Sequence, residues 1–182
     1  MNLAQIIKYE GDNQTFVWKH PCEDFNTLSQ LIVHESQEAL FFANGQALDL
    51  FGPGRYTLKT ENIPILRKLQ SIPTNGETPF HCEVYFINKT TQMAIKWGTD
   101  SKVEYTDPTY GFPLCIGVSG ELSLRAEDSR KLIVKLVGTE NDLSQAHLTS
   151  YFRGIIMASV KPYIAQIMRT SKISIFEAYE HI

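Results

Sequence analysis

The chain has 182 residues, 43% of them hydrophobic and 20% charged, with a formal net charge of -3 and a pI near 5.9. This length and composition are typical of one soluble globular domain, here with an appended helix. The slightly acidic balance excludes the broad basic surface of a nucleic-acid-binding protein and gives no bulk attraction to anionic lipid.

The apolar runs, the termini and the cysteines indicate in which cellular compartment the protein works. No run of about 18 apolar residues is present, so we expect no transmembrane helix. The N-terminus lacks the basic segment and apolar core of a secretory signal. Three scattered cysteines predict reduced thiols in the cytoplasm. The last residues have a helical pattern without a stop signal, so we expect a longer protein to continue beyond Ile182.

The first third of the chain predicts strands and turns. Residues 2–9 and 14–19 are short apolar segments, either strands or an N-terminal arm. Between Leu31 and Leu58, two apolar runs are joined by Asn44-Gly45, the strongest short hairpin signal. Gly52-Pro53-Gly54 then requires a second sharp turn.

The middle of the chain continues this pattern. We predict a two-turn helix at 63–69 and a turn cluster at 74–79. Residues 80–97 alternate in polarity and predict a second hairpin, and 98–113 predicts a polar, aromatic loop. Residues 114–125 form the clearest strand pattern, so one half-buried antiparallel sheet is expected.

After this strand the apolar residues recur at the spacing of three and four that is typical of a helix. Glu127-Asp128-Ser129 caps a predicted helix that Gly138 ends. A longer helix starts at Asp142 or Ser144 and is expected to bend at 158–162, because it contains a proline. Strands followed by helices predict an α+β fold: an antiparallel sheet built from hairpins, then C-terminal helices.

We expect three parts along the chain. Residues 1–25 form an N-terminal arm that packs on the domain, 26–172 form the domain, and 173–182 start a further helix. The apolar stripe of the long helix has two interpretations, core packing or an oligomerising helix over 167–182.

Cysteine and histidine supply the candidates for chemistry. A hydrolase would pair Cys22, Cys82 or Cys115 with one of four histidines, namely His20, His34, His81 and His147. We expect Cys82 and Cys115 to face inward as small hydrophobes, which argues against a polarised nucleophile. A metal site would need His20, Cys22, His81 and Cys82, but neighbours on a strand point to opposite faces. We therefore predict no catalytic residue, no cofactor and no metal site.

Two loops are candidate binding sites. Gly52-Pro53-Gly54 lacks the donors of a phosphate loop and predicts a plain turn, with Arg55 exposed beyond it. The aromatic residues of 98–113 either form an interaction surface or fold onto the sheet, and the pattern leaves both open: Tyr105, Tyr110 and Phe112.

Several segments resemble, in order, the SPFH (band 7) domains of the stomatin, prohibitin and flotillin superfamily. They are Leu31–Ala39, Asn44-Gly45, Phe51–Leu58, Glu77–Lys89, Lys96–Thr99, Gly120–Ser129 and Phe152–Ile156. Three more segments resemble a bacterial branch called "virion core protein-like": Trp18–Pro21, Gly45–Asp49 and Thr60–Pro64.

The resemblance implies a non-enzymatic scaffold that forms a homo-oligomer and organises or recruits proteins at the bacterial membrane, including in membrane stress. It implies a cytoplasmic protein peripheral to the inner face of the cell membrane, held by a membrane protein or by the membrane surface. Neither nucleic acid nor a small-molecule substrate is expected. Two alternatives stay open: a soluble ligand-binding or thiol-dependent hydrolytic α+β domain that uses the 98–113 loop, and an adaptor that does not self-assemble.

Overall fold

The computed structural model describes the following residues: 5–11, 15–25, 29–58, 80–90, 93–139, 144–172, 174 and 176–177. The chain divides into two compact units. The first unit consists of Met1–Met93 and Arg125–His147, and the second of Ala94–Leu124 and Leu148–Ile182. The helix expected at 63–69, the turn cluster at 74–79 and most of the helix expected at 173–182 lie outside the described residues. The division at residues 25 and 172 stays a prediction.

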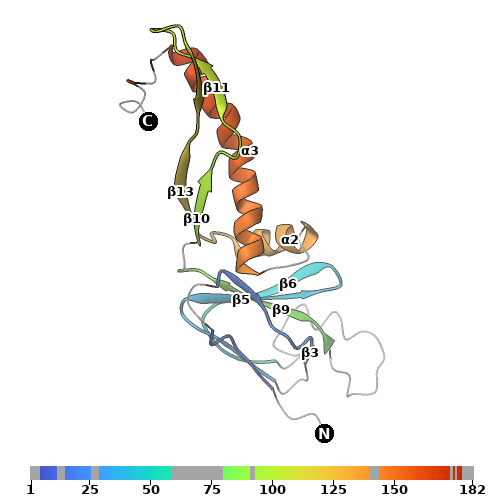
Figure 1. Ribbon diagram of the computed structural model, residues 1–182. Helices are drawn as coiled ribbons and strands as arrows, with labels where there is room; N and C mark the ends of the chain where they lie inside the picture. The colour runs from blue at the N-terminus through green and yellow to red at the C-terminus, as the bar shows by residue number, and fades with distance from the viewer. Residues whose placement is uncertain are drawn as a thin grey trace. The chain divides into compact units, whose positions relative to one another are not determined.

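A four-stranded antiparallel sheet forms the centre of the first unit (Figure 1). Its strands, in spatial order, are β2 (Val17–Lys19), β9 (Glu83–Asn88), β5 (Gln37–Ala43) and β6 (Gln46–Phe51). The predicted hairpin at Asn44-Gly45 is confirmed, since these two residues join β5 to β6 with φ angles of 51° and 73°. Positive φ at both positions is what a two-residue turn of type I′ requires.

The other strands among the described residues of the first unit form two smaller sheets. One has the order β1 (Ile6–Ile7), β4 (Gln30–Val33) and β7 (Gly54–Thr57), with β1 parallel to β4. The other pairs β3 (Asp24–Phe25) with β8 (Phe80–His81). The turn at Gly52-Pro53-Gly54 carries the chain from β6 in one sheet to β7 in another. The Tyr56 hydroxyl holds this turn by donating to the Gly52 carbonyl at 3.0 Å.

The first unit buries one apolar cluster and docks a helix on its sheet. The cluster draws on every sheet of the unit, and its fully buried members include Ile7, Phe25, Leu31, Ala39, Phe41, Leu58 and Val84. Helix α2 (Ser129–Thr139) begins where predicted, because the Asp128 carboxylate accepts the backbone N–H of Lys131 at 2.9 Å. The Arg130 guanidinium donates to the Ala47 and Leu48 carbonyls of β6 and ties the helix to the sheet.

The second unit is a long two-stranded ribbon beside one helix (Figure 1). In the ribbon, β10 (Met93–Gly98) pairs with β13 (Ser119–Leu124), and β11 (Val103–Thr106) pairs with β12 (Pro113–Ile116). The Thr99 N–H donates to the Val118 carbonyl at 2.9 Å and links the two halves. Helix α3 (Gln145–Ser171) follows Ser144, whose hydroxyl accepts the His147 N–H, and it continues through Pro162.

The α+β class is confirmed, with mostly antiparallel strands and two helices at the C-terminal end. The strands lie in several small sheets rather than in one. The hairpin predicted for 80–97 is wrong: β9 pairs with β2 and β5, whereas β10 pairs with β13. The segment 98–113 contains β11, and the strand predicted for 114–125 is two strands separated at Gly117-Val118.

Candidate interaction surface

The buried thiol lies in the core of the first unit. Cys82 belongs to its apolar cluster, and burial raises the pKa of its thiol to about 12. A thiol held protonated in this way is a poor nucleophile. Cys22 is half-buried, and its thiol donates to the Gln5 side-chain oxygen at 3.4 Å. His20 accepts the backbone N–H of Cys22 at 3.1 Å, so this imidazole orders the backbone before β3.

The third thiol corrects a sequence prediction. Cys115 is exposed, not buried, since on β12 it faces away from its half-buried neighbours Leu114 and Ile116. In the ladder it stands opposite Glu104, which is also exposed. Among the histidines, His34 is exposed and His147 lies half-buried on α3. Within the described part of the chain, no group of three or more His, Cys, Asp or Glu side chains could hold a metal ion.

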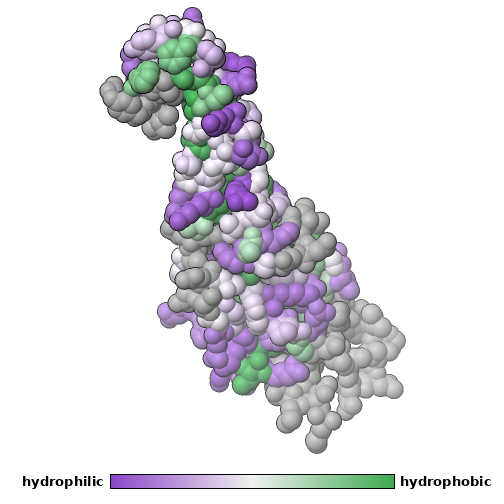
Figure 2. Space-filling model, viewed as in Figure 1, coloured by the Kyte–Doolittle hydropathy of each residue, from purple (hydrophilic) through white to green (hydrophobic). Residues whose placement is uncertain are grey.

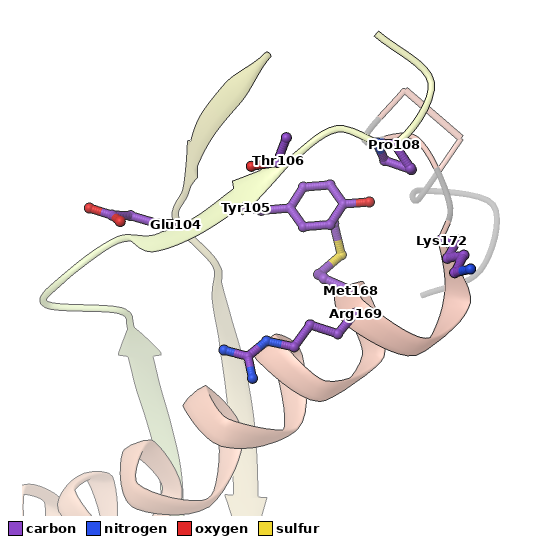
Figure 3. A pocket seen from close by; sticks show the side chains of 7 residues that line it. All are labelled: Glu104, Tyr105, Thr106, Pro108, Met168, Arg169 and Lys172. Carbon is purple, nitrogen blue, oxygen red and sulfur yellow. The ribbon is translucent and has the colours of Figure 1, made fainter. Parts of the chain in front are cut away.

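A pocket of about 290 Å³ lies in the second unit, between β11 and the end of α3. The pocket is lined by Glu104, Tyr105, Thr106, Pro108, Met168, Arg169 and Lys172. Because this lining contains neither cysteine nor histidine, the pocket does not favour the hydrolytic alternative. Figure 3 shows the Tyr105 ring over the Met168 thioether, whereas Thr106 points away from the helix. Contact between this ring and the thioether packs the ribbon on α3. The two cationic side chains of the lining are Arg169 and Lys172.

Exposed aromatic rings lie at the same end of the second unit. Tyr110 is 62% exposed, and its ring centroid is 6.0 Å from Phe112 and 5.7 Å from Phe176. The buried Asp107 fixes this turn by accepting the Tyr110 N–H and the Ser174 hydroxyl. Hydrophobic side chains are visible at this end in Figure 2. Each of the two interpretations of the 98–113 segment therefore holds for part of it. Tyr105 packs inside the unit, on the helix, whereas the rings of Tyr110 and Phe112 remain accessible for an interaction.

The long helix also presents apolar side chains to solvent. Ile155, Tyr163 and Ile167 are exposed on α3. No helix among the described residues has the length and the apolar character needed to cross a membrane. The second unit thus offers exposed strand edges, aromatic rings and an apolar helix face, which are features of an interaction surface.

Comparisons with known proteins identify the family. The chain is similar to the uncharacterized protein YdjI of Bacillus subtilis (strain 168), at 28% identity over 144 residues. The match covers 76% of this chain and 43% of YdjI, so the chain spans less than half the length of that relative. No solved structure matches the chain. The family model described as "SPFH domain-Band 7 family" matches residues 17–181. Because this match covers nearly all of the sequence, the chain belongs to the SPFH domain-Band 7 family.

Proposed function

We propose that this chain is a non-enzymatic scaffold domain that self-associates and organises or recruits partner proteins at the inner face of the bacterial cell membrane. The observation that carries the proposal is the family match over residues 17–181, which supports a scaffold and membrane-associated role in general terms. Self-association, the recruitment of partners and a part in membrane stress are the specific content of the proposal.

Two features of the described residues support this assignment over a hydrolase. The core thiol Cys82 is shielded and protonated, and none of the residues that line the pocket in the second unit is a cysteine or a histidine. The second unit exposes apolar groups on both of its layers, for example Leu122 on the ribbon and Tyr163 on the helix. Solvent-exposed apolar groups on two layers suit protein contacts better than turnover of a small molecule.

Flotation with membrane vesicles tests the membrane part of the proposal. The purified chain is mixed with inner-membrane vesicles, with the same vesicles stripped of exposed protein by protease, and with protein-free vesicles of bacterial lipids. Co-flotation with untreated vesicles alone would indicate recruitment by a membrane protein, and co-flotation with all three would indicate the membrane surface. Failure to float with any of them contradicts a membrane role for this chain.

A further inference from the structure

The ribbon of the second unit leaves a strand edge open on each side. Within the described residues, β10 pairs with β13 alone, and β11 pairs with β12 alone. The outer edge of each strand therefore has backbone groups without a strand partner. A two-stranded ribbon is marginally stable by itself, and a third strand or a packed helix strengthens it. Helix α3 supplies one such support, and a further strand at the open edge would add another.

The apolar face of the ribbon is covered unevenly. The Trp97 ring comes within 2.9 Å of the position that a Cβ at Gly120 would take, so these two residues stand opposite each other on β10 and β13. In an antiparallel pair this register also sets Ile95 opposite Leu122, on the same face. Ile95 is fully buried, whereas Leu122 is 40% exposed. The β13 side of the ribbon is thus the uncovered side.

The polar face of the ribbon carries complementary charges at the same level. The register places Lys96 of β10 opposite Glu121 of β13, and both side chains are exposed. If β10 of a second copy pairs with β13 in this register, its Lys96 lies on the open side of Glu121. Charges then alternate across the extended sheet, and the second copy's Ile95 lies beside Leu122.

Helix α3 has two different flanks. One row of side chains, at spacings of four, three and four, is bulky and apolar: Ile156, Val160, Tyr163 and Ile167. The row with the same spacing on the other flank consists mostly of small residues: Gly154, Ala158, Lys161 and Ala165. We call these the bulky row and the small row. Tyr163 of the bulky row is 63% exposed.

Contacts to the ribbon show which flank lies on which side. Lys161 of the small row bonds the Asp100 carboxylate and the Ser101 hydroxyl, just past the end of β10. The small row is therefore on the β10 side of the unit. The bulky row, on the opposite flank, is on the β13 side, together with the uncovered Leu122.

The spacings of strands and helices agree with a side-by-side array. Two strands take up about 9.6 Å across a sheet, because neighbouring strands lie roughly 4.8 Å apart. Packed helices lie about 8–10 Å apart. A copy placed one ribbon further along the sheet therefore brings its α3 to a normal packing distance, with the bulky row of one copy against the small row of the next.

We propose that copies of this chain associate side by side through the second unit. β13 of one copy pairs with β10 of the next, and the bulky row of its α3 packs on the small row of the neighbouring helix. The contact joins two different surfaces, so it closes into a ring or continues as a filament. This inference rests on the proposed self-association and specifies the surface that performs it.

Two substitutions of exposed apolar side chains by glutamate test the interface. Tyr163→Glu places a charge in the bulky row, where Tyr163 is 63% exposed, and Val134→Glu is the control, since Val134 is 50% exposed on α2 of the first unit. We expect Tyr163→Glu to weaken self-association about tenfold or more, measured by light scattering on a sizing column, and Val134→Glu to leave it unchanged. Circular dichroism checks that both variants fold.

Cysteine cross-linking distinguishes the geometry. The background carries Cys22→Ser and Cys115→Ser, and retains the buried Cys82. Tyr163→Cys and Ala165→Cys are prepared separately, then oxidised alone and mixed. We expect disulfide-linked dimers in the mixture and not in either pool alone. Dimers within the Tyr163→Cys pool would mean a symmetric helix pair and would overturn the proposal.

The remaining outcomes separate the two proposals. If the unmodified chain is monomeric, self-association and this interface both fail. If it associates, but Tyr163→Glu changes nothing or the mixed pools do not cross-link, the interface is wrong and self-association stands. If Tyr163→Glu abolishes binding to anionic lipid vesicles and leaves the mass unchanged, the bulky row faces lipid and the proposal is overturned.

Discussion

Replacement of Phe41 by alanine should severely destabilise the first unit. Phe41 is fully buried at the middle of β5, opposite Val84 of β9, and its ring centroid lies 4.9 Å from that of Phe51. Truncation of a fully buried phenylalanine to alanine costs about 3–5 kcal/mol, because transfer energy is lost and a cavity remains. Domains are typically stable by about 5–15 kcal/mol, so this loss is a large share of the total.

Urea unfolding followed by tryptophan fluorescence measures this effect. Trp18 packs against the core cluster of the first unit, whereas Trp97 belongs to the second unit, so a Trp97→Phe background isolates the relevant signal. Val134→Ala is the control, because Val134 lies in the same unit, is 50% exposed, and its truncation should cost less than about 0.5 kcal/mol. Equal urea midpoints for Phe41→Ala and Val134→Ala would refute the assignment of the core.

Three further predictions concern the turn, the thiols and an ion pair. Gly45→Val should destabilise the β5–β6 hairpin by about 1–2 kcal/mol, because φ is 73° at this position. Ellman's reagent should modify Cys115 in the native chain and reach Cys82 after unfolding only, since burial raises the pKa of Cys82 to about 12. The hydrogen bond from Lys161 lowers the pKa of Asp100, so its contribution to stability is present above the unfolded pKa and is lost as pH falls through the folded pKa. Lys161→Met should raise the pKa of Asp100 in an NMR titration.

Each of these predictions has an outcome that contradicts it. Gly45→Val with an unchanged melting temperature would mean that the turn is not left-handed. Equal modification rates for Cys82 and Cys115 in the native chain would mean that the core is open to solvent. An unchanged Asp100 titration in Lys161→Met would mean that the ion pair between α3 and the ribbon does not form in solution.

Local signals in the sequence predicted local structure well. Asn44-Gly45, the Asp128 cap and the Ser144 start were all recognisable, because each depends on a few neighbouring residues. The pairing of strands was not recognisable in the same way. The alternation over residues 80–97 is the same whether β9 and β10 pair with each other or, as observed, lie in different sheets.

The interaction surface was partly predictable for the same reason. The aromatic segment was identified as a candidate from composition, but the packing of Tyr105 on Met168 joins residues far apart in the chain. The exposure of Cys115 was missed because it depends on which face of β12 turns toward the helix. The bond between Lys161 and Asp100 shows on which side of the ribbon each row of α3 lies. The periodicity of the sequence does not reveal this bond.

The central claim is that this chain is a self-associating scaffold, and sedimentation velocity over a range of concentrations tests it most directly. The account predicts that the weight-average sedimentation coefficient rises with protein concentration toward a species larger than a monomer. A single species at the mass of one 20.7 kDa chain, unchanged at every concentration, would contradict it.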